Sequence, residues 1–266
     1  MKQVAQLDSG FDGVDYLRIQ KADGSWANGG NQSWWKEKAN SQKEKNYADH
    51  KSDVNYRLWI EGCGVIAGSN AEIYLSQHND DIVSSSDFYD KSSGSIEKEV
   101  YMDYVMSRFS SIYKISGSLL SYISGLRGDQ LARGMRNYLS TNKIGYSHAQ
   151  WAPHCFRKKA QQKKLILKDI REMLENNIPV VFNYYRMDKK NITMYYDLEG
   201  AVQRDGNHTG TDAHYMTIIG LYKYLNETSL DDQYILKVES WGQIFYIRYD
   251  EYAMNLNYFS SILKIY

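Results

Sequence analysis

Residues 62–75 of the chain read GCGVIAGSNAEIYL. The small and apolar residues from Val65 to Leu75 recur at a spacing that approximates one face of an α-helix. A cysteine flanked by two glycines precedes them, and glycine permits the sharp turn with which such a helix begins. The sequence therefore predicts a helix that carries Cys63 in its first turn.

The position of Cys63 suits a reactive thiol. The thiolate is the nucleophilic form of cysteine, and a helix N-terminus stabilises it through partial positive charge and unpaired N–H groups. The neighbouring Gly62 and Gly64 also let a substrate carbonyl approach the backbone, as an oxyanion hole requires. A buried structural cysteine in a tight turn accounts for the same residues. The nucleophile hypothesis therefore needs a base elsewhere in the chain.

His214 is the candidate base. It opens an apolar strand, residues 215–220 (YMTIIG), directly after a polar loop. A histidine there points into a cleft at the end of a sheet, and a strand-end histidine solvated by the loop is the alternative interpretation. Glu239 ends a later strand, where a carboxylate can hold an imidazole in the tautomer and orientation that pair it with a thiolate.

Helical periodicity fills the middle of the chain. Helices are expected over residues 96–109, after Asp129, and over residues 163–175. From residue 178 the pattern becomes that of strands, expected over residues 178–185, 214–224, 233–240, 243–249 and 260–266. Short connections between the later strands predict an antiparallel meander. The fold class is therefore α+β.

Two segments are read as irregular. Residues 1–50 are punctuated by glycine and carry a charged run, so they are interpreted as an N-terminal arm that packs through Trp26, Trp34 and Trp35. Residues 189–211 are interpreted as a long polar loop that leads into the histidine. The remaining chain, residues 51–266, is expected to form one large domain.

These motifs resemble a known family. A cysteine at a helix start, a histidine at a strand start, and an acceptor followed by Ser240-Trp241-Gly242 are similar to the papain-like cysteine peptidases. The wider order resembles the bacterial branch related to bacteriocin-leader, double-glycine-type peptidases, with a Pro-Val strand at Pro179-Val180. The resemblance covers residues 55–249 as ordered short motifs. Cysteine and histidine stand 214 − 63 = 151 positions apart, just past the span of about 130 to 150 in papain-type enzymes.

The resemblance implies a papain-like domain whose nucleophile helix packs on an antiparallel sheet. It implies a cysteine peptidase that cleaves peptide or isopeptide amide bonds in a peptide or protein substrate, with no cofactor. Cys63 would be the nucleophile, His214 the base and Glu239 the acceptor, at a position where related enzymes have Asn or Asp. Trp241 would shield the contact between Glu239 and His214 from water.

The same resemblance calls for an oxyanion-hole donor. Related enzymes place a glutamine about six residues before the cysteine, and this chain has Arg57 there. Asn55 is the nearest upstream amide, so it is expected to act together with the backbone N–H of Cys63. Two alternatives stay open: a non-catalytic peptide-binding module that keeps the cleft, and a thiol acyltransferase or deamidase that uses the same triad.

Composition excludes several other functions. Lys plus Arg and Asp plus Glu number 32 each, so no global field recruits nucleic acid. No apolar run is long enough to span a membrane. Met1 to Gly13 lacks a secretory layout, which is consistent with a cytoplasmic protein or with a signal already removed. His148, His154 and Cys155 lack the second pair that a zinc site needs, and the two cysteines are expected to be free thiols.

Overall fold

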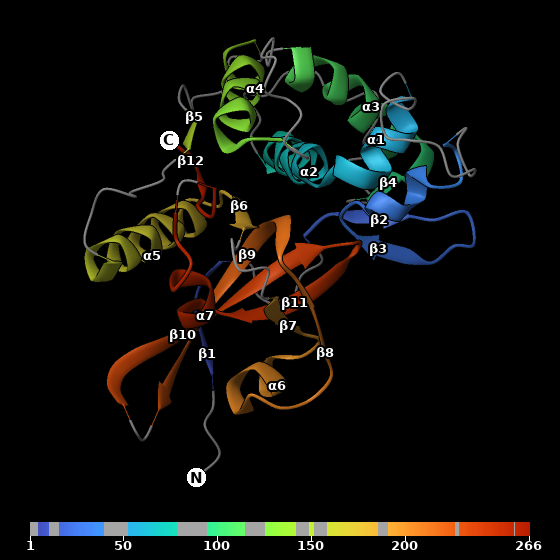
Figure 1. The fold of residues 1–266 in the computed structure, drawn as a ribbon. Coiled ribbons are helices and arrows are strands. Elements are labelled where there is room, and N and C mark those ends of the chain that lie inside the picture. Colours follow the sequence, from blue (N-terminus) through green and yellow to red (C-terminus); the bar gives the residue numbers. More distant parts are fainter. Residues whose placement is uncertain are drawn as a thin grey trace.

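The computed structural model describes residues 5–10, 16–39, 53–78, 95–114, 126–141, 149–151, 159–185, 191–226, 229–257 and 259–266. The helices of residues 54–141 gather on one side of a twisted sheet, whereas the helices of residues 159–175 and 198–203 lie elsewhere around it (Figure 1). The main sheet is antiparallel, which confirms the expected α+β class. No helix within these ranges is long and apolar enough to cross a membrane.

The main sheet is built around one long hairpin. The strands β9 (Ala213–Asn226), β10 (Ser229–Ser240) and β11 (Gln243–Arg248) run antiparallel to one another, as the meander prediction requires. Strand β6 (Val180–Tyr185) pairs with the first part of β9. This arrangement sets the start of β9, where the candidate base lies, next to the end of β10.

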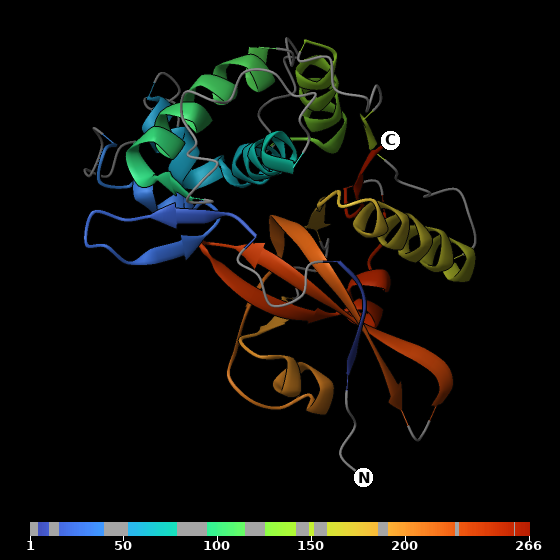
Figure 2. The ribbon, with the colours of Figure 1, turned by 180° about the vertical axis from the view of Figure 1, so that it is seen from behind.

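Helices predicted from periodicity are present with shifted ends. They are α3 (Lys98–Lys114), α4 (Gly128–Thr141) and α5 (Lys159–Glu175). A shorter helix, α1 (Val54–Glu61), leads through a single residue into α2 (Cys63–His78). Residues 64–76 of α2 are all buried, because this helix packs on β9 and is itself covered by α3 and α4 (Figure 2).

The N-terminal segment is more ordered than the arm expected from its composition. Strand β1 (Gln6–Gly10) pairs with β9 in the main sheet. The strands β2 (Arg18–Gln20) and β3 (Trp26–Asn28) form a small sheet with β4 (Ser95–Glu97). A 3₁₀ turn, η1 (Gln32–Trp35), follows and buries Trp35 completely. The described part of this segment thus belongs to the sheet and core.

The interpretation of residues 189–211 as a loop was wrong. The segment contains β7 (Ile192–Tyr195), α6 (Leu198–Gln203) and β8 (His208–Thr211). These elements are only four to six residues long, so they leave no clear periodicity. Side-chain hydrogen bonds organise them instead: Asp197 caps α6 by accepting from the Gly200 N–H at 2.6 Å.

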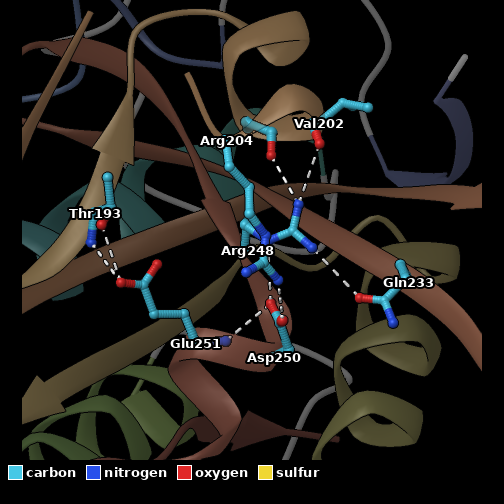
Figure 3. A network of polar contacts seen from close by, with 8 residues as sticks. Thr193, Val202, Arg204, Gln233, Arg248, Asp250 and Glu251 are labelled. Carbon is cyan, nitrogen blue, oxygen red and sulfur yellow. Dashed lines mark hydrogen bonds and ion pairs between the residues drawn. The ribbon is translucent and has the colours of Figure 1, made fainter. Parts of the chain in front are cut away.

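Arg248 holds the segment of residues 192–211 in place by contacts to α6 (Figure 3). Its side chain is 5% exposed and donates to the carbonyl oxygen of Ala201 at 2.9 Å, with further contacts to Val202 and Gln233. Carbonyl groups in the last turn of a helix have no partner within the helix, so the guanidinium satisfies the C-terminal end of α6. A carboxylate, Asp250, lies 3.4 Å from its Nε.

Replacing this guanidinium is expected to destabilise the fold. Arg248→Met leaves buried carbonyl groups unsatisfied, and a lost hydrogen bond to a charged group costs about 1.5–3 kcal/mol. Urea unfolding should show this loss in the free energy of unfolding. Arg204→Met is the matched control, because the Arg204 side chain is 62% exposed in its ion pair with Asp250 and exposed pairs contribute about 1 kcal/mol or less. Equal effects of the two variants would contradict the anchoring role.

Candidate functional site

One small pocket brings together three of the four residues that the sequence singles out. Cys63, His214 and Glu239 all line it. The rest of its lining consists of Gly30, Gln32, Ile66, Ala67, Asn70, Tyr215, Met216, Ser240 and Trp241. Its cavity volume is about 10 Å³, which is room for about one water molecule. The pocket as it stands therefore accepts a single small group beside the sulfur.

Helix α2 supplies one wall of the pocket. Cys63, Ile66, Ala67 and Asn70 follow the spacing i, i+3, i+4, i+7, which places them on one face of a helix. The helix begins at Cys63, as predicted. At Gly64 a Cβ atom would lie 3.1 Å from the Tyr215 ring, so the absence of a side chain lets the first turn of α2 approach strand β9.

His214 is held by residues at the end of β10 and in the turn after it. The side chain is buried, and its Nε2 lies 2.7 Å from the hydroxyl of Ser240. The ring of Trp241 lies against it, tilted by 32°, with centroids 4.7 Å apart. An imidazole that donates its Nε2 hydrogen to Ser240 keeps the lone pair on Nδ1, which is what a base requires.

The turn that carries Trp241 is itself unusual. Trp241 has φ of 50° and Gly242 has φ of 75°, and together they form the two-residue connection between β10 and β11. A left-handed conformation costs a non-glycine residue about 1–2 kcal/mol. Backbone strain of this kind gathers at functional sites. In this turn, the left-handed conformation places the indole of Trp241 against the imidazole of His214.

Glu239 does not take the place that the sequence suggested for it. Its carboxyl group accepts from the side-chain amide of Asn70 at 2.6 Å, on helix α2, and Ser240 contacts His214 instead. The reason is strand alternation: Glu239 pairs with Thr217, so the next residue, Ser240, points the other way, with Met216 and His214. The expected partner is thus displaced by one position.

Asn55 is not part of the pocket lining. It lies in the first turn of α1, with its Oδ1 buried and without a partner among the described residues. It stands on α1, a helix separate from the one that begins at Cys63, and the structure does not bring its amide to the pocket. A different carboxamide, Gln32, does line the pocket. It comes from η1 in the N-terminal segment, and no spacing relative to the cysteine would have indicated it.

Burial sets the protonation states of the candidate pair. It lowers the pKa of His214 to about 4 and raises the pKa of the Cys63 thiol, although backbone N–H groups of Tyr215 and Gly64 oppose the latter. At neutral pH the histidine is therefore a neutral imidazole and the sulfur a thiol. Within the described ranges the two side chains make no hydrogen bond to each other. Such contacts often tighten only when a substrate binds.

The residues considered for a zinc site, His148, His154 and Cys155, lie outside the part of the chain that the structure describes. The Nδ1 of His208 lies 3.1 Å from the carbonyl oxygen of Gly206, and its ring is tilted against that of Tyr195 with centroids 5.7 Å apart. Across the part of the chain that the structure describes, no three His, Cys, Asp or Glu side chains gather as a metal would require.

A second pocket lies beside Arg248, where the network of Figure 3 contributes Arg204, Asp250 and Glu251. Both of its carboxylates already accept hydrogen bonds from the protein. Glu251 accepts from both the N–H and the hydroxyl of Thr193, at 3.2 and 3.0 Å. This pocket therefore offers no unpaired nucleophile or base, and the Cys63 pocket is the stronger candidate.

Removing the hydroxyl that holds His214 tests the geometry of the site. Ser240→Ala deletes the only group hydrogen-bonded to the ring in the described structure. A neutral hydrogen bond contributes about 1–1.5 kcal/mol, so turnover is expected to fall about tenfold. Ser76→Ala, another buried serine that bonds only to a carbonyl in its own helix, is the control and should keep full turnover. A Ser240→Ala protein as active as the control would show that the hydroxyl does not orient His214 for a role as base.

Comparison with known proteins does not add to this description. No protein-family model matches the chain, no curated protein is significantly similar to it, and no solved structure matches its fold.

Proposed function

We propose that the chain is a thiol-dependent hydrolase with a papain-like arrangement, and that it cleaves amide bonds of peptides or proteins. The observation that carries the proposal is that Cys63 and His214, 151 positions apart in the sequence, line one pocket at the start of a buried helix. A thiol, an imidazole with a free lone pair, and a carboxamide at Gln32 are the groups that acyl transfer to sulfur requires.

The reaction follows from the neutral resting state. Nδ1 of His214 takes the thiol proton while the sulfur of Cys63 bonds to the substrate carbonyl carbon, and the π electrons move onto oxygen. The backbone N–H of Cys63 and the amide of Gln32 stabilise that oxyanion. As the C–N bond breaks, the imidazolium returns its proton to the leaving amine. Water then attacks the thioester, its proton passes to His214, and the carboxylic acid and the thiol are released.

Release of new amino termini tests this function. The protein should liberate α-amino groups from denatured casein, and iodoacetamide pretreatment should abolish that release. Ammonia release without new amino termini would point to deamidation by the same thiol. Binding of casein peptides with neither product would show a non-catalytic binding module and would contradict the hydrolase.

A further inference from the structure

The pocket beside Arg248 is much larger than the pocket beside Cys63. Its cavity volume is about 260 Å³, against about 10 Å³, and sites for small ligands begin at about 300 Å³. The walls come from β7, from the residue that ends α6, and from α7 (Tyr249–Ala253) with the residue after it. The cavity therefore has room for a molecule of about the size of an amino acid.

Glu251 supplies a negative charge at one wall of this cavity. Its Oε1 accepts from the N–H and the hydroxyl of Thr193, which are both neutral groups. Its Oε2 accepts no hydrogen bond from the described residues, and no lysine or arginine among them forms an ion pair with it. A carboxylate forms its strongest hydrogen bonds with cationic donors, so this wall suits the ammonium group of a ligand.

Arg204 supplies a positive charge at another wall. It is the residue that ends α6, and its side chain is 62% exposed. Its Nη2 donates to Asp250 Oδ2 at 3.1 Å, as Figure 3 shows. A guanidinium carries five N–H donors, so the remaining donors of Arg204 are open to a ligand. A carboxylate matches them best, because it can accept two parallel hydrogen bonds.

The other two charged residues of the pocket hold this arrangement together. The buried guanidinium of Arg248 donates to carbonyl groups of α6, so its N–H groups are already used. Asp250 is shared between the two arginines, through Arg204 Nη2 at 3.1 Å and Arg248 Nε at 3.4 Å. One carboxylate thus offsets one of two guanidinium groups. A positive charge on the arginine side and the negative charge of Glu251 remain for a ligand to compensate.

Tyr195 and Met254 complete the lining of the cavity. Tyr195 is 6% exposed, and its hydroxyl forms no hydrogen bond within the described part of the chain. Buried polar groups normally have such a partner. Burial, followed by the charge of Glu251, raises the pKa of Tyr195, so the hydroxyl keeps its hydrogen and can donate it. Met254 is 63% exposed, and its flexible thioether side chain adapts to apolar groups.

We propose that this pocket binds a free α-amino acid with an apolar side chain. The ammonium group pairs with Glu251. The carboxylate accepts from Arg204 and from the Tyr195 hydroxyl, and the side chain lies against Met254. A zwitterion matches the opposite charges of the two walls, whereas a ligand with a single charge leaves one wall uncompensated. Binding uses no group of the Cys63 pocket, so the site is independent of the proposed hydrolase.

Three ligands that differ only in charge test the proposal on the wild-type protein. Isothermal titration calorimetry should show one site for L-leucine, with a Kd below about 1 mM. Leucinamide lacks the carboxylate and N-acetyl-leucine lacks the ammonium group, so each should bind at least about tenfold more weakly. Absence of saturable L-leucine binding overturns the proposal, as does either analogue binding as tightly as L-leucine.

Two substitutions then locate the site. Arg204→Met and Glu251→Gln should each weaken L-leucine binding at least about tenfold, and the glutamine keeps an oxygen that accepts from Thr193. Arg133→Met and Glu172→Gln are the matched controls, because each removes a partly exposed charge from an ion pair outside the pocket, and both should bind like wild type. Wild-type affinity in either pocket variant overturns the assignment. Should a pocket variant fail to fold, the comparison of the three ligands decides.

Discussion

Cys63→Ala is expected to abolish turnover, lowering the rate of casein cleavage by at least about 10⁴-fold. In the proposed reaction the sulfur of Cys63 forms the covalent bond to the substrate, and no other group that lines the pocket can take that role. Among the other lining residues, Ser240 and Tyr215 carry hydroxyl groups. Ser240 already contacts His214. The remaining activity is measured as new amino termini.

The fold should survive this substitution. Cys63 is only partly buried and forms no disulfide, and alanine is a better helix former than cysteine. Circular dichroism and the thermal midpoint should therefore change little. Cys155→Ala provides the matched control, because it removes the other thiol of the chain, and it should keep full activity. Activity that persists in Cys63→Ala but disappears in Cys155→Ala would identify Cys155 as the nucleophile and contradict the assignment to Cys63.

His214→Gln is expected to cost about 10³-fold in turnover at pH 7, within the range for loss of a general base. Glutamine keeps a polar side chain of similar reach and can still bond to Ser240, so the loss reports the missing base. His208→Gln, an exposed histidine outside the pocket, is the control and should have no effect. Equal activity of the two variants would exclude His214 as the base.

The pH dependence of the wild-type protein follows from the same residue. A pKa of about 4 for His214 means that the basic form is already present above that pH. Turnover at pH 5.5 should therefore stay close to that at pH 7.5, whereas a histidine of ordinary pKa, about 6.5, would lose about tenfold. Because the thiol pKa is raised, the plateau should disappear in His214→Gln, whose activity should rise only at alkaline pH. A wild-type profile that rises through about 6.5 would contradict the buried neutral base.

Before substrate binds, Cys63 is a neutral thiol and His214 a neutral imidazole. This differs from a site in which the two groups form a thiolate–imidazolium ion pair. A thiolate beside an imidazolium needs charge stabilisation, and the pocket of Cys63 offers only backbone N–H groups against the effect of burial. A neutral thiol with a neutral base needs none until the substrate arrives. The proton then moves together with carbon–sulfur bond formation. The two pKa shifts of the site are thus consistent with one mechanism.

The parts of the fold that follow a regular period could be predicted from the sequence. Helix α2 and the hairpin of β9 and β10 bury continuous apolar faces, and these set the relative positions of Cys63 and His214. Short elements such as β7 and α6 could not be predicted, because polar contacts made by Arg248 and Asp197 hold them together. Interactions of that kind depend on the tertiary structure and leave no periodicity.

The site shows the same division. The positions of Cys63 at a helix start and of His214 at a strand start could be predicted from the sequence. The third group does not, since adjacent strand residues face opposite ways and only the register between β9 and β10 shows that Ser240 reaches the ring. Gln32 reaches the pocket from a segment that looked irregular. Both the contact of Ser240 with His214 and the position of Gln32 depend on long-range packing, which local sequence patterns do not encode.

The burst reaction with p-nitrophenyl acetate tests the central claim most directly, because it asks whether Cys63 is an activated nucleophile without requiring the natural substrate. The account predicts one p-nitrophenolate released rapidly per protein molecule, with the acetyl group mapped by peptide mass spectrometry to Cys63 and with the burst lost in His214→Gln. Acetyl groups scattered over lysines, or a burst that is unchanged without His214, would contradict it.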